Sequence, residues 1–282
     1  TYPGTKRVQP ATSDCRNEPM NLIEQLSTLQ PNMVRWRHEI HQYPETAYQE
    51  TRTADLVARE LEQMGLEVHR GLAETGVVGV LSAGRGNRAI GLRADLDALN
   101  LQELNHFEHR SLHDGKMHAC GHDGHTAMLL GAAKHLSTDP GFNGTVFFIF
   151  QPAEEGPPPG EEGGAKLMIK EGVLKNPDVD VIFGLHINSG TPVNTIKYKS
   201  GGTMAAVERF VVTVKGKQTH GSAPWTGVDP ILISAKIIDG FQTIISRESP
   251  LVDEAAVITV GKITAGVRFN IIPESAEMIG TV

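Results

Sequence analysis

The feature of this sequence that most constrains its fold is a series of short apolar runs separated by longer helical patterns. The runs lie at 77–81, 89–93, 145–150 and 179–185. Strands that are apolar on both faces belong to a sheet that is covered on both sides, and the intervening helices supply the crossovers that parallel strands need. The sequence therefore predicts an α/β domain in which a mostly parallel sheet carries helices on both faces.

The predicted helices fall between these runs, as such a fold requires. Apolar residues recur at helical spacing over 22–64, where Pro44 divides the stretch into two helices and Gly65 occupies the position of a C-terminal glycine. Two further helices are predicted at 124–136 and 165–174. Helices and strands thus alternate through the first part of the chain.

The pattern changes near residue 200. Segment 208–215 alternates apolar and polar residues as a half-exposed strand does, and 230–246 has helical periodicity. Two more strands are predicted at 256–264 and 275–282. This β-α-β-β order resembles the start of a split β-α-β, ferredoxin-like sandwich with antiparallel pairing. We therefore predict a polar tail at 1–20, a larger domain at 21–199 and a smaller α+β domain at 200–282.

The composition limits the classes of protein that remain. The chain has 282 residues, is 39% hydrophobic and 21% charged, and carries a net charge of −7, which is ordinary for a globular protein of one or two domains. The mild acidity argues against nucleic acid or a membrane as a partner, and no apolar run approaches the ~18 residues of a membrane span. Cys15 and Cys120 lie far apart, which favours a reducing compartment or a ligand role over a bridge. We expect a cytoplasmic location, with the periplasm or secretion after signal removal as the alternative.

Titratable side chains follow three of the predicted strands. Asp95 follows the second apolar run, and His186 follows the fourth. The pair Glu154 and Glu155 follows the third. Because ligands bind beyond the carboxyl ends of parallel strands, we expect these groups at one edge of the sheet, where one glutamate can coordinate a metal while the other carries a proton. A rival glutamate pair at 161–162 follows no strand and is interpreted as loop charges.

The segment 118–125 (HACGHDGH) packs three histidines, a cysteine and an aspartate into eight residues ahead of a predicted helix. A lone histidine is usually a surface or core residue, but thiolate, imidazole and carboxylate groups gathered beside glycines are typical ligands of zinc or a similar transition metal. Cys120 and His122 lie two apart on a loop and can turn toward one point. Together with Glu155 and His186, they would be enough ligands for one metal ion. For a two-metal site they would supply most of the ligands, and one ligand would be missing.

Two other motifs are interpreted as structural. The segment 84–89 fits G-x-G-x-x-A, but a strand follows it where a dinucleotide site needs a helix, so we expect a hairpin turn at 84–87. The segment 38–41 (HEIH) has histidines three apart, whereas the H-E-x-x-H zinc motif needs four. It is interpreted as the end of a helix before Pro44.

Four segments together match the pattern of one known family. They are RADLDALN (93–100), HACGHDGHTAMLLGAA (118–133), QPAEEG (151–156) and HGSAPWTGVDP (220–230). In this combination the chain resembles the dinuclear-metal amidohydrolases, which include aminoacylases, carboxypeptidase G and hippurate hydrolase. With its cysteine, the second segment resembles the version of this motif found in the branch of hippurate and indole-acetyl-amino-acid hydrolases. The resemblance extends from about residue 21 to residue 282.

The resemblance implies a role for each site residue of the larger domain. It implies two divalent metal ions, zinc or manganese. It also implies that the ligands of these ions are Cys120, His122, Glu155 and His186. Glu154 would be the general base that activates water. Asp95 would support the metal site from behind its ligands.

In the smaller domain, the resemblance implies that His220 reaches the active site of the partner subunit to polarise the scissile carbonyl, and that Asn270 contacts the substrate. Family members continue past the position of Val282 with the rest of this lid domain and a final catalytic segment. The resemblance therefore implies that both domains are unfinished in this chain.

The function implied by the resemblance is that of a metal-dependent hydrolase. It would cleave the amide bond of N-acyl or N-aminoacyl amino acids with metal-activated water and act as a homodimer joined through the lid domain. Its partners would be small-molecule substrates, with no nucleic acid or membrane. The alternative is a catalytically incompetent fragment that binds metal and dimerises.

Overall fold

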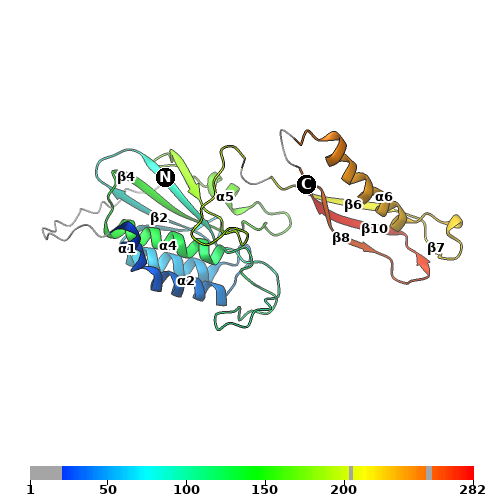
Figure 1. Cartoon of the computed structure of the whole chain (residues 1–282), viewed down its shortest axis with the longest axis horizontal. Helices are drawn as coiled ribbons and strands as arrows, with labels where there is room; N and C mark the ends of the chain where they lie inside the picture. The colour runs from blue at the N-terminus through cyan, green and yellow to red at the C-terminus, as the bar shows by residue number, and fades with distance from the viewer. Residues whose placement is uncertain (1–20, 203–205, 252–255) are drawn as a thin grey trace. The chain divides into compact units, whose positions relative to one another are not determined.

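The computed structural model describes residues 21–202, 206–251 and 256–282, and the chain folds as two compact units, Thr1–Gly190 and Thr191–Val282 (Figure 1). The polar tail predicted at 1–20 lies outside the described residues, as does Cys15. Among the residues described, no helix has the length and apolar character needed to cross a membrane.

The first unit begins with helices, and strands and helices alternate in its later part, as predicted. Its elements in chain order are α1 (Leu22–Ser27), α2 (Gln30–Gln42), α3 (Thr51–Gln63), β1 (Glu67–Leu72), β2 (Gly76–Ala83), β3 (Ala89–Asp95), α4 (His122–Thr138), β4 (Gly144–Gln151), α5 (Gly164–Lys170) and β5 (Val181–Gly184). Capping residues set the start of α1 and the end of α3. Asn21 caps α1, because its side chain accepts from the Ile23 amide while Glu24 reaches back to the Asn21 amide. Gly65 follows α3 with a φ of 81°, a conformation that glycine adopts without strain.

The five strands of this unit form one sheet in the order β1-β2-β4-β3-β5. Strand β3 pairs in parallel with both β4 and β5, whereas β2 is antiparallel to β1 and to β4. Four of the five strands therefore run in the same direction, with β2 opposed. The prediction of an α/β fold built on a mostly parallel sheet is confirmed.

Two details of the sheet differ from expectation. The turn at 84–87 does not close a hairpin, because β4 lies between β2 and β3 and pairs with both of them. Instead, Asn143, next to the start of β4, holds this turn by accepting from the amides of Arg85 and Gly86. Strand β1 was not expected from the sequence, because its residues (EVHRGL) are largely polar and only partly buried.

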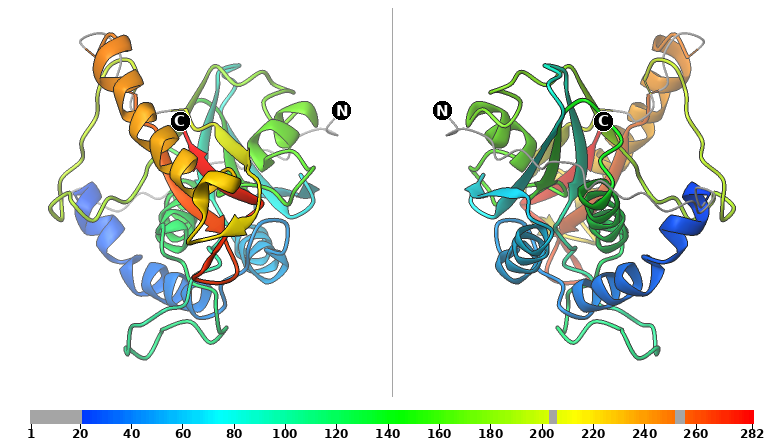
Figure 2. Two further views of the ribbon diagram at one scale, coloured as in Figure 1. Left: turned by 90° about the vertical axis from the view of Figure 1, so that its right-hand side faces the viewer. Right: turned by 90° about the vertical axis from the view of Figure 1, so that its left-hand side faces the viewer.

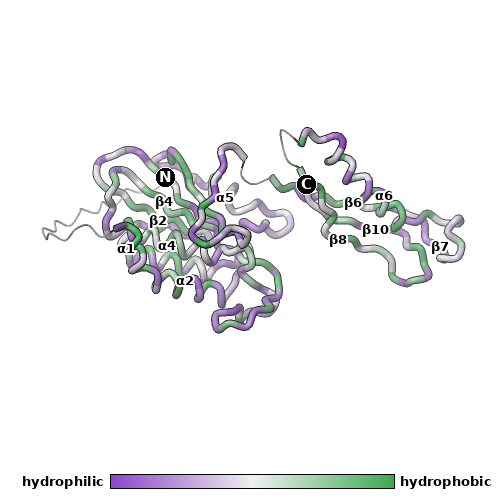
Figure 3. Tube along the Cα trace, in the orientation of Figure 1, coloured by the Kyte–Doolittle hydropathy of each residue, from purple (hydrophilic) through white to green (hydrophobic). Residues whose placement is uncertain are grey.

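The sheet is covered on both faces, and side-chain alternation along β4 divides the core into two layers. Phe148 and Phe150 pack with the helices α2, α3 and α4, while Phe147 and Ile149 face Met168 of α5. Figure 2 shows α5 on the opposite side of the sheet from α3 and α4, and Figure 3 shows the apolar character of β2 and β4. Burying each such side chain is worth about 1.5–3 kcal/mol relative to leaving it exposed.

The fourth apolar run forms the edge strand β5, and the expectation of burial is wrong for it. Val181, Ile182 and Phe183 are 43%, 48% and 55% exposed. An edge strand has a sheet neighbour on one side alone, and β5 pairs with β3 only. By contrast, all eight residues of β2 are buried, as its apolar sequence predicts.

The second unit has the predicted β-α-β-β order with short additions. Its elements are β6 (Arg209–Lys215), β7 (Thr219–His220), the 3₁₀ helix η1 (Pro224–Thr226), α6 (Pro230–Thr243), the π-helical turn η2 (Ile244–Glu248), β8 (Thr259–Ala265), β9 (Ile271–Ile272) and β10 (Ser275–Thr281). Strand β10 lies between β6 and β8 and is antiparallel to both. Ile237 and Ile238 of α6 pack on Val214 and Met278, which gives this unit its own small core.

Candidate metal centre

Three parallel strands bring the predicted site residues of the first unit to one edge of the sheet. Asp95 is the last residue of β3 and lies opposite Gln151, the last residue of β4. The glutamate pair begins at the third residue after the end of β4, and His186 is the second residue after the end of β5. The N-terminus of α4 begins at His122 beside them. Six sequence-predicted residues therefore meet here: Asp95, Cys120, His122, Glu154, Glu155 and His186.

His122 lies at the centre of this cluster and is fully buried. Its Nδ1 is 2.8 Å from the carbonyl oxygen of Asp97, which can only accept, so Nδ1 carries the proton and donates it. The other ring nitrogen, Nε2, is buried and has no hydrogen-bond partner among the described residues. Carboxylate oxygens of Asp95, Glu154 and Glu155 each lie 3.7 Å from Nε2.

This spacing around Nε2 fits a cation. A distance of 3.7 Å is too long for a hydrogen bond, so the carboxylates surround the nitrogen without bonding to it. Two ligands that each lie ~2.1 Å from one tetrahedral metal ion are about 3.4 Å apart. An unpaired buried nitrogen ringed by carboxylate oxygens at this separation is therefore suited to a divalent metal ion.

Cys120 and His186 face each other on the same side of His122. The Cys120 Sγ lies 3.4 Å from His186 Nε2, and His186 Nδ1 donates to the carbonyl of Ile187 at 2.6 Å. In its neutral form His186 therefore keeps Nε2 unprotonated, as His122 does, and this nitrogen can accept from the Cys120 thiol. Three groups of ligand atoms lie within 4.8 Å of one another: Cys120 with His122 and His186, Asp95 with His122 and His125, and His122 with Glu154 and Glu155.

The electrostatics of the cluster favour added positive charge. Burial, together with the Glu155 and Glu154 carboxylates, raises the pKa of Cys120 to about 12. Burial and the charges of Asp95 and Glu155 also raise the pKa of Glu154. The pKa of His122 is raised because Asp97 and the neighbouring carboxylates outweigh the opposing effect of burial. Neighbouring carboxylates contribute to all three shifts, besides the effect of burial, and a bound cation would offset their negative charge.

Asp95 contacts the cluster from behind. Its Oδ1 accepts from Nδ1 of His125 at 2.6 Å, and its Oδ2 accepts from Arg93 at 2.7 Å. Burial acts to raise the pKa of Asp95, but these partners and the charge of His122 hold it at about 2. The Nε2 of His125 in turn accepts from the Ile187 amide at 2.8 Å. Both nitrogens of His125 are thus engaged, and the pair Asp95–His125 fixes the main chain next to His186.

Sequence reasoning missed several buried residues that support the cluster. Asp97 accepts from the Glu155 amide at 2.8 Å as well as from His122 through its carbonyl. Asp123 accepts from His41 at 2.7 Å and from Arg37 at 2.8 Å. The only sequence signal for Asp97 and Asp123 was their place in the strings RADLDALN and HACGHDGH.

The HEIH segment and the glutamate pair at 161–162, neither of which was predicted to be part of the site, have different outcomes. His41, from the HEIH segment, does lie near the end of α2, but it is buried and bridges Asp123 and Glu103. It therefore belongs to the layer behind the segment 118–125. The rival pair at 161–162 follows expectation, because Glu162 forms ion pairs with Lys166 and Lys170 on the surface.

His220 and Asn270 lie close together in the second unit, because His220 ends β7 and Asn270 directly precedes β9, the strand that pairs with it. His220 pairs with Ile271 between β7 and β9, and the Gly221 amide donates to the Asn270 carbonyl at 2.8 Å. His220 is exposed, and its Nδ1 lies 2.7 Å from the Ser222 hydroxyl. The side-chain oxygen of Asn270 is buried and has no hydrogen-bond partner within the described part of the chain.

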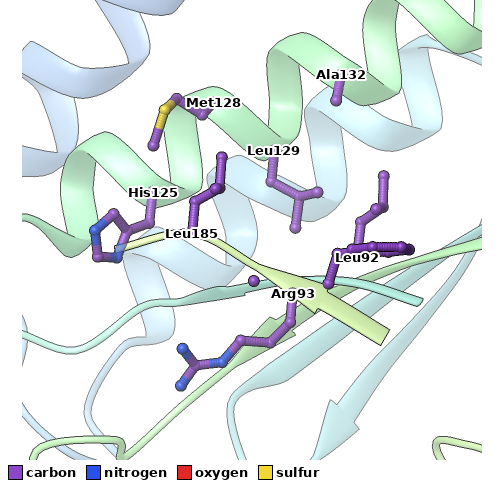
Figure 4. A pocket seen from close by; sticks show the side chains of 9 residues that line it. Leu92, Arg93, His125, Met128, Leu129, Ala132 and Leu185 are labelled. Atoms are coloured by element: carbon purple, nitrogen blue, oxygen red, sulfur yellow. The ribbon is translucent and has the colours of Figure 1, made fainter. Parts of the chain in front are cut away.

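An apolar pocket of about 230 Å³ borders the cluster between α4, β3 and β5. Figure 4 shows His125 at one end of it, Leu129 and Leu185 along it, and the guanidinium of Arg93 below. Arg93 and His125 are the two residues that hold Asp95. The pocket thus adjoins the supporting layer of the centre.

The fold and this centre define an α/β protein with a cysteine-histidine-carboxylate site suited to divalent metal ions. Residues 91–279 match the profile of peptidase family M20/M25/M40. The chain belongs to this family, which confirms the resemblance found in the sequence.

The relatives agree with this assignment. Hippurate hydrolase of Campylobacter jejuni is 44% identical over 261 residues, which cover 92% of this chain and 66% of that protein. IAA-amino acid hydrolase ILR1-like 4 of Arabidopsis thaliana is 43% identical over 88% of this chain and 55% of its own length. The structure of Bacillus subtilis YXEP, a dinuclear metal-binding peptidase of the M20 family, superposes with a TM-score of 0.69 at 36% identity, covering 90% of this chain and 64% of YXEP. The chain thus spans between about half and two thirds of these relatives.

Proposed function

We propose that this protein is a metal-dependent hydrolase that cleaves the amide bond of N-acyl or N-aminoacyl amino acids. The observation that carries the proposal is the buried, unpartnered Nε2 of His122 with three carboxylate oxygens 3.7 Å away. Hippurate hydrolase and the IAA-amino acid hydrolase, by their names, act on acylated amino acids. Their identity to this chain supports the same class of substrate.

Cys120, His122, Glu155 and His186 would hold two divalent ions, zinc or manganese. When bound, such ions lower the pKa of water from ~15.7 toward about 7 and polarise the substrate carbonyl. The two histidines support this assignment because each donates Nδ1–H to a main-chain carbonyl, which leaves Nε2 as the nitrogen that faces the cluster; Nε2 of His186 lies 3.4 Å from the Cys120 Sγ. Asp97 supports the role of Glu155, since it fixes the Glu155 main chain through a 2.8 Å hydrogen bond.

Glu154 would act as the general base. Its side chain is 36% exposed, against 24% for Glu155, so it keeps access to a water and to the substrate. Its carboxylate would accept the proton of the attacking water and return it to the leaving nitrogen. Burial raises the pKa of Glu154, and a base with a pKa closer to neutrality is better matched to both transfers.

The second unit would serve as the lid and dimerisation domain. His220 would polarise the scissile carbonyl in the partner subunit, and the unpaired amide oxygen of Asn270 would contact the substrate. The exposure of His220 supports its role, because a side chain that acts in another subunit must be accessible. The homodimer and the cytoplasmic location stay predictions.

The test is metal analysis combined with hydrolysis of hippurate and of N-acetyl amino acids. We expect the purified chain to contain divalent metal, and we expect Glu154→Gln to keep the metal while the rate falls by about 10²–10⁴-fold. Glu161→Gln is the matched control, because Glu161 lies farther along the same loop and outside the cluster, and it should leave the rate unchanged. A protein that binds no divalent metal would refute the proposal.

The second candidate function is a metal-binding, dimerising chain without turnover. It is favoured by one observation, namely that the chain covers 66% of hippurate hydrolase and 55% of the plant relative. Metal binding without hydrolysis of any substrate in the panel would support this candidate over the first.

A further inference from the structure

Glu50 is a buried carboxylate that the proposed reaction does not use. It is the N-cap residue of α3 and has no exposed surface, yet its side chain does not cap the helix. Instead, Oε2 accepts from the Thr75 hydroxyl at 2.6 Å and Oε1 accepts from the Ala153 amide at 2.9 Å. A carboxylate is costly to bury unless its oxygens are bonded, so these contacts define what Glu50 does in the fold.

Ala153, the residue that Glu50 holds, has an unfavourable backbone conformation. Its φ is 49°, in the left-handed region, which is unfavourable for a residue with a side chain. Ala153 is 2% exposed and directly precedes Glu154. The direction in which the chain leaves β4, and hence the placement of Glu154 and Glu155, depends on this conformation.

The loop that starts at Ala153 is held at its far end as well. The hydroxyl of Tyr48, two residues before Glu50, donates to the carbonyl of Glu162. The two ends of the loop meet where the Gly164 amide donates to the Ala153 carbonyl at 3.3 Å. A Cβ at Gly164 would lie only 1.8 Å from the Pro152 carbonyl oxygen, so the chain passes itself closely here.

We propose that Glu50 is a positioning residue that holds Ala153 in its left-handed conformation and thereby sets the placement of Glu154 and Glu155. The inference rests on the proposed function for the roles of these two glutamates. The segment before α3 would then hold the loop through two contacts, one from Glu50 and one from Tyr48.

The first measurement is amide hydrogen exchange at Ala153 in the 282-residue chain, together with the affinity for Co²⁺. We expect Glu50→Ala to lose protection at Ala153 by at least about tenfold and to bind Co²⁺ about 10–100-fold more weakly, as changes behind metal ligands do. Glu50→Gln should stay within about threefold of the parent in both, because the amide oxygen can accept from Ala153 while its NH₂ donates to Thr75.

Glu60→Ala is the matched control for loss of a buried carboxylate. Glu60 also belongs to α3 and is 8% exposed, but it pairs with Arg35 and does not touch the loop. It should lower the thermal midpoint while leaving protection at Ala153 and the Co²⁺ affinity unchanged.

Ala153→Gly provides a rescue that a merely structural role would not allow. Glycine adopts a φ of 49° without strain, so the double variant Glu50→Ala/Ala153→Gly should recover most of the lost Co²⁺ affinity. Glu50→Ala with unchanged exchange at Ala153 would overturn the inference, as would a double variant no better than Glu50→Ala alone. If the parent binds no Co²⁺, the proposed function fails, and the exchange at Ala153 by itself still decides whether Glu50 braces the loop.

Discussion

Single residues of the candidate metal centre are held by partners one layer behind them. His122 and His186 each donate through Nδ1 to a main-chain carbonyl, which determines the nitrogen that faces the cluster. Asp97 fixes the main chain of Glu155, and Glu50 fixes that of Ala153. All four contacts are made by protein groups one layer behind the cluster, and such support reduces the ordering that the binding of a metal ion requires.

The state of Cys120 leads to a prediction about protons. With its pKa raised to about 12, the thiol is protonated at neutral pH in the metal-free protein, whereas the thiolate is the metal ligand. Zn²⁺ binding at pH 7 should therefore release about one proton from Cys120, and the affinity should rise with pH. Calorimetry in buffers of different ionisation enthalpy measures the protons released.

The comparison for this prediction is Cys120→Ser, which should release about one proton fewer than the parent and bind Zn²⁺ more weakly. Equal proton release by the two proteins would mean that the thiol is not a ligand.

Asp123 leads to a prediction about stability and pH. Burial acts to raise its pKa, but the hydrogen bond from His41 and the charges of His118 and Arg37 hold it at about 2. A carboxylate with a lowered pKa in the folded state stabilises the fold above its unfolded value near 3.8 and loses this contribution as the pH falls toward 2. In chelator-treated protein, Asp123→Asn should therefore cost about 2 kcal/mol in urea unfolding at pH 5 and less at pH 2.5. Glu39→Gln, which breaks an exposed pair with Arg52, should cost under about 0.5 kcal/mol at either pH.

The sequence allowed the residues of the centre to be predicted far better than those behind it. Cys120, His122 and the glutamate pair stand in strings whose spacing points to metal chemistry. Glu50 and His41 stand in ordinary helical surroundings, and their partners Ala153 and Asp123 are 103 and 82 positions away. Contacts at that separation are created by the packing of α2 and α3 on the sheet, which local patterns do not encode.

At the scale of elements, strands β4 and β5 both contain an apolar run but differ in burial, and this difference should be visible in stability. Phe148 of β4 has no exposed surface, whereas Phe183 of the edge strand β5 is 55% exposed. Phe148→Ala should cost about 3–5 kcal/mol in the free energy of unfolding, because it opens a cavity between the sheet and its helices. Phe183→Ala removes the same atoms from a surface and should cost less than about 1.5 kcal/mol. Equal losses in chemical denaturation would show that β5 is covered in solution.

Apolar patterning predicts where strands lie in the sequence better than it predicts which strands pair in the sheet. Strands β2 and β4 were found because burial on both faces makes them largely apolar, and β3 was found from its apolar start at 89–92. Strand β1 escaped because a half-exposed edge tolerates polar residues. The order of the strands, with β4 inserted between β2 and β3, depends on long-range pairing, and so the turn at 84–87 could be located but not assigned.

At the scale of the whole molecule, the chain between the two units should be the first site of proteolysis. Between β5 and β6, the described residues 185–202 contain no helix or strand, and Ile196 and Tyr198 are 77% and 94% exposed. Proteases cut first where an exposed segment can adapt to their active sites. Limited trypsin treatment should therefore cleave first after Lys197 or Lys199, and mass spectrometry of the early fragments identifies the site.

The larger fragment should still bind metal ions. Cys120, His122, Glu155 and His186 all precede the unit boundary at Gly190, and their supporting partners Asp95, Asp97 and His125 belong to the same unit. The Co²⁺ affinity of the isolated fragment should thus lie within about threefold of that of the uncut chain, because second-layer contacts that tune affinity remain intact. The same fragment carrying His122→Ala is the control and should not bind. If the fragment without the second unit loses Co²⁺ while remaining folded by circular dichroism, then that unit supplies a ligand and the assignment of the centre to the first unit is wrong.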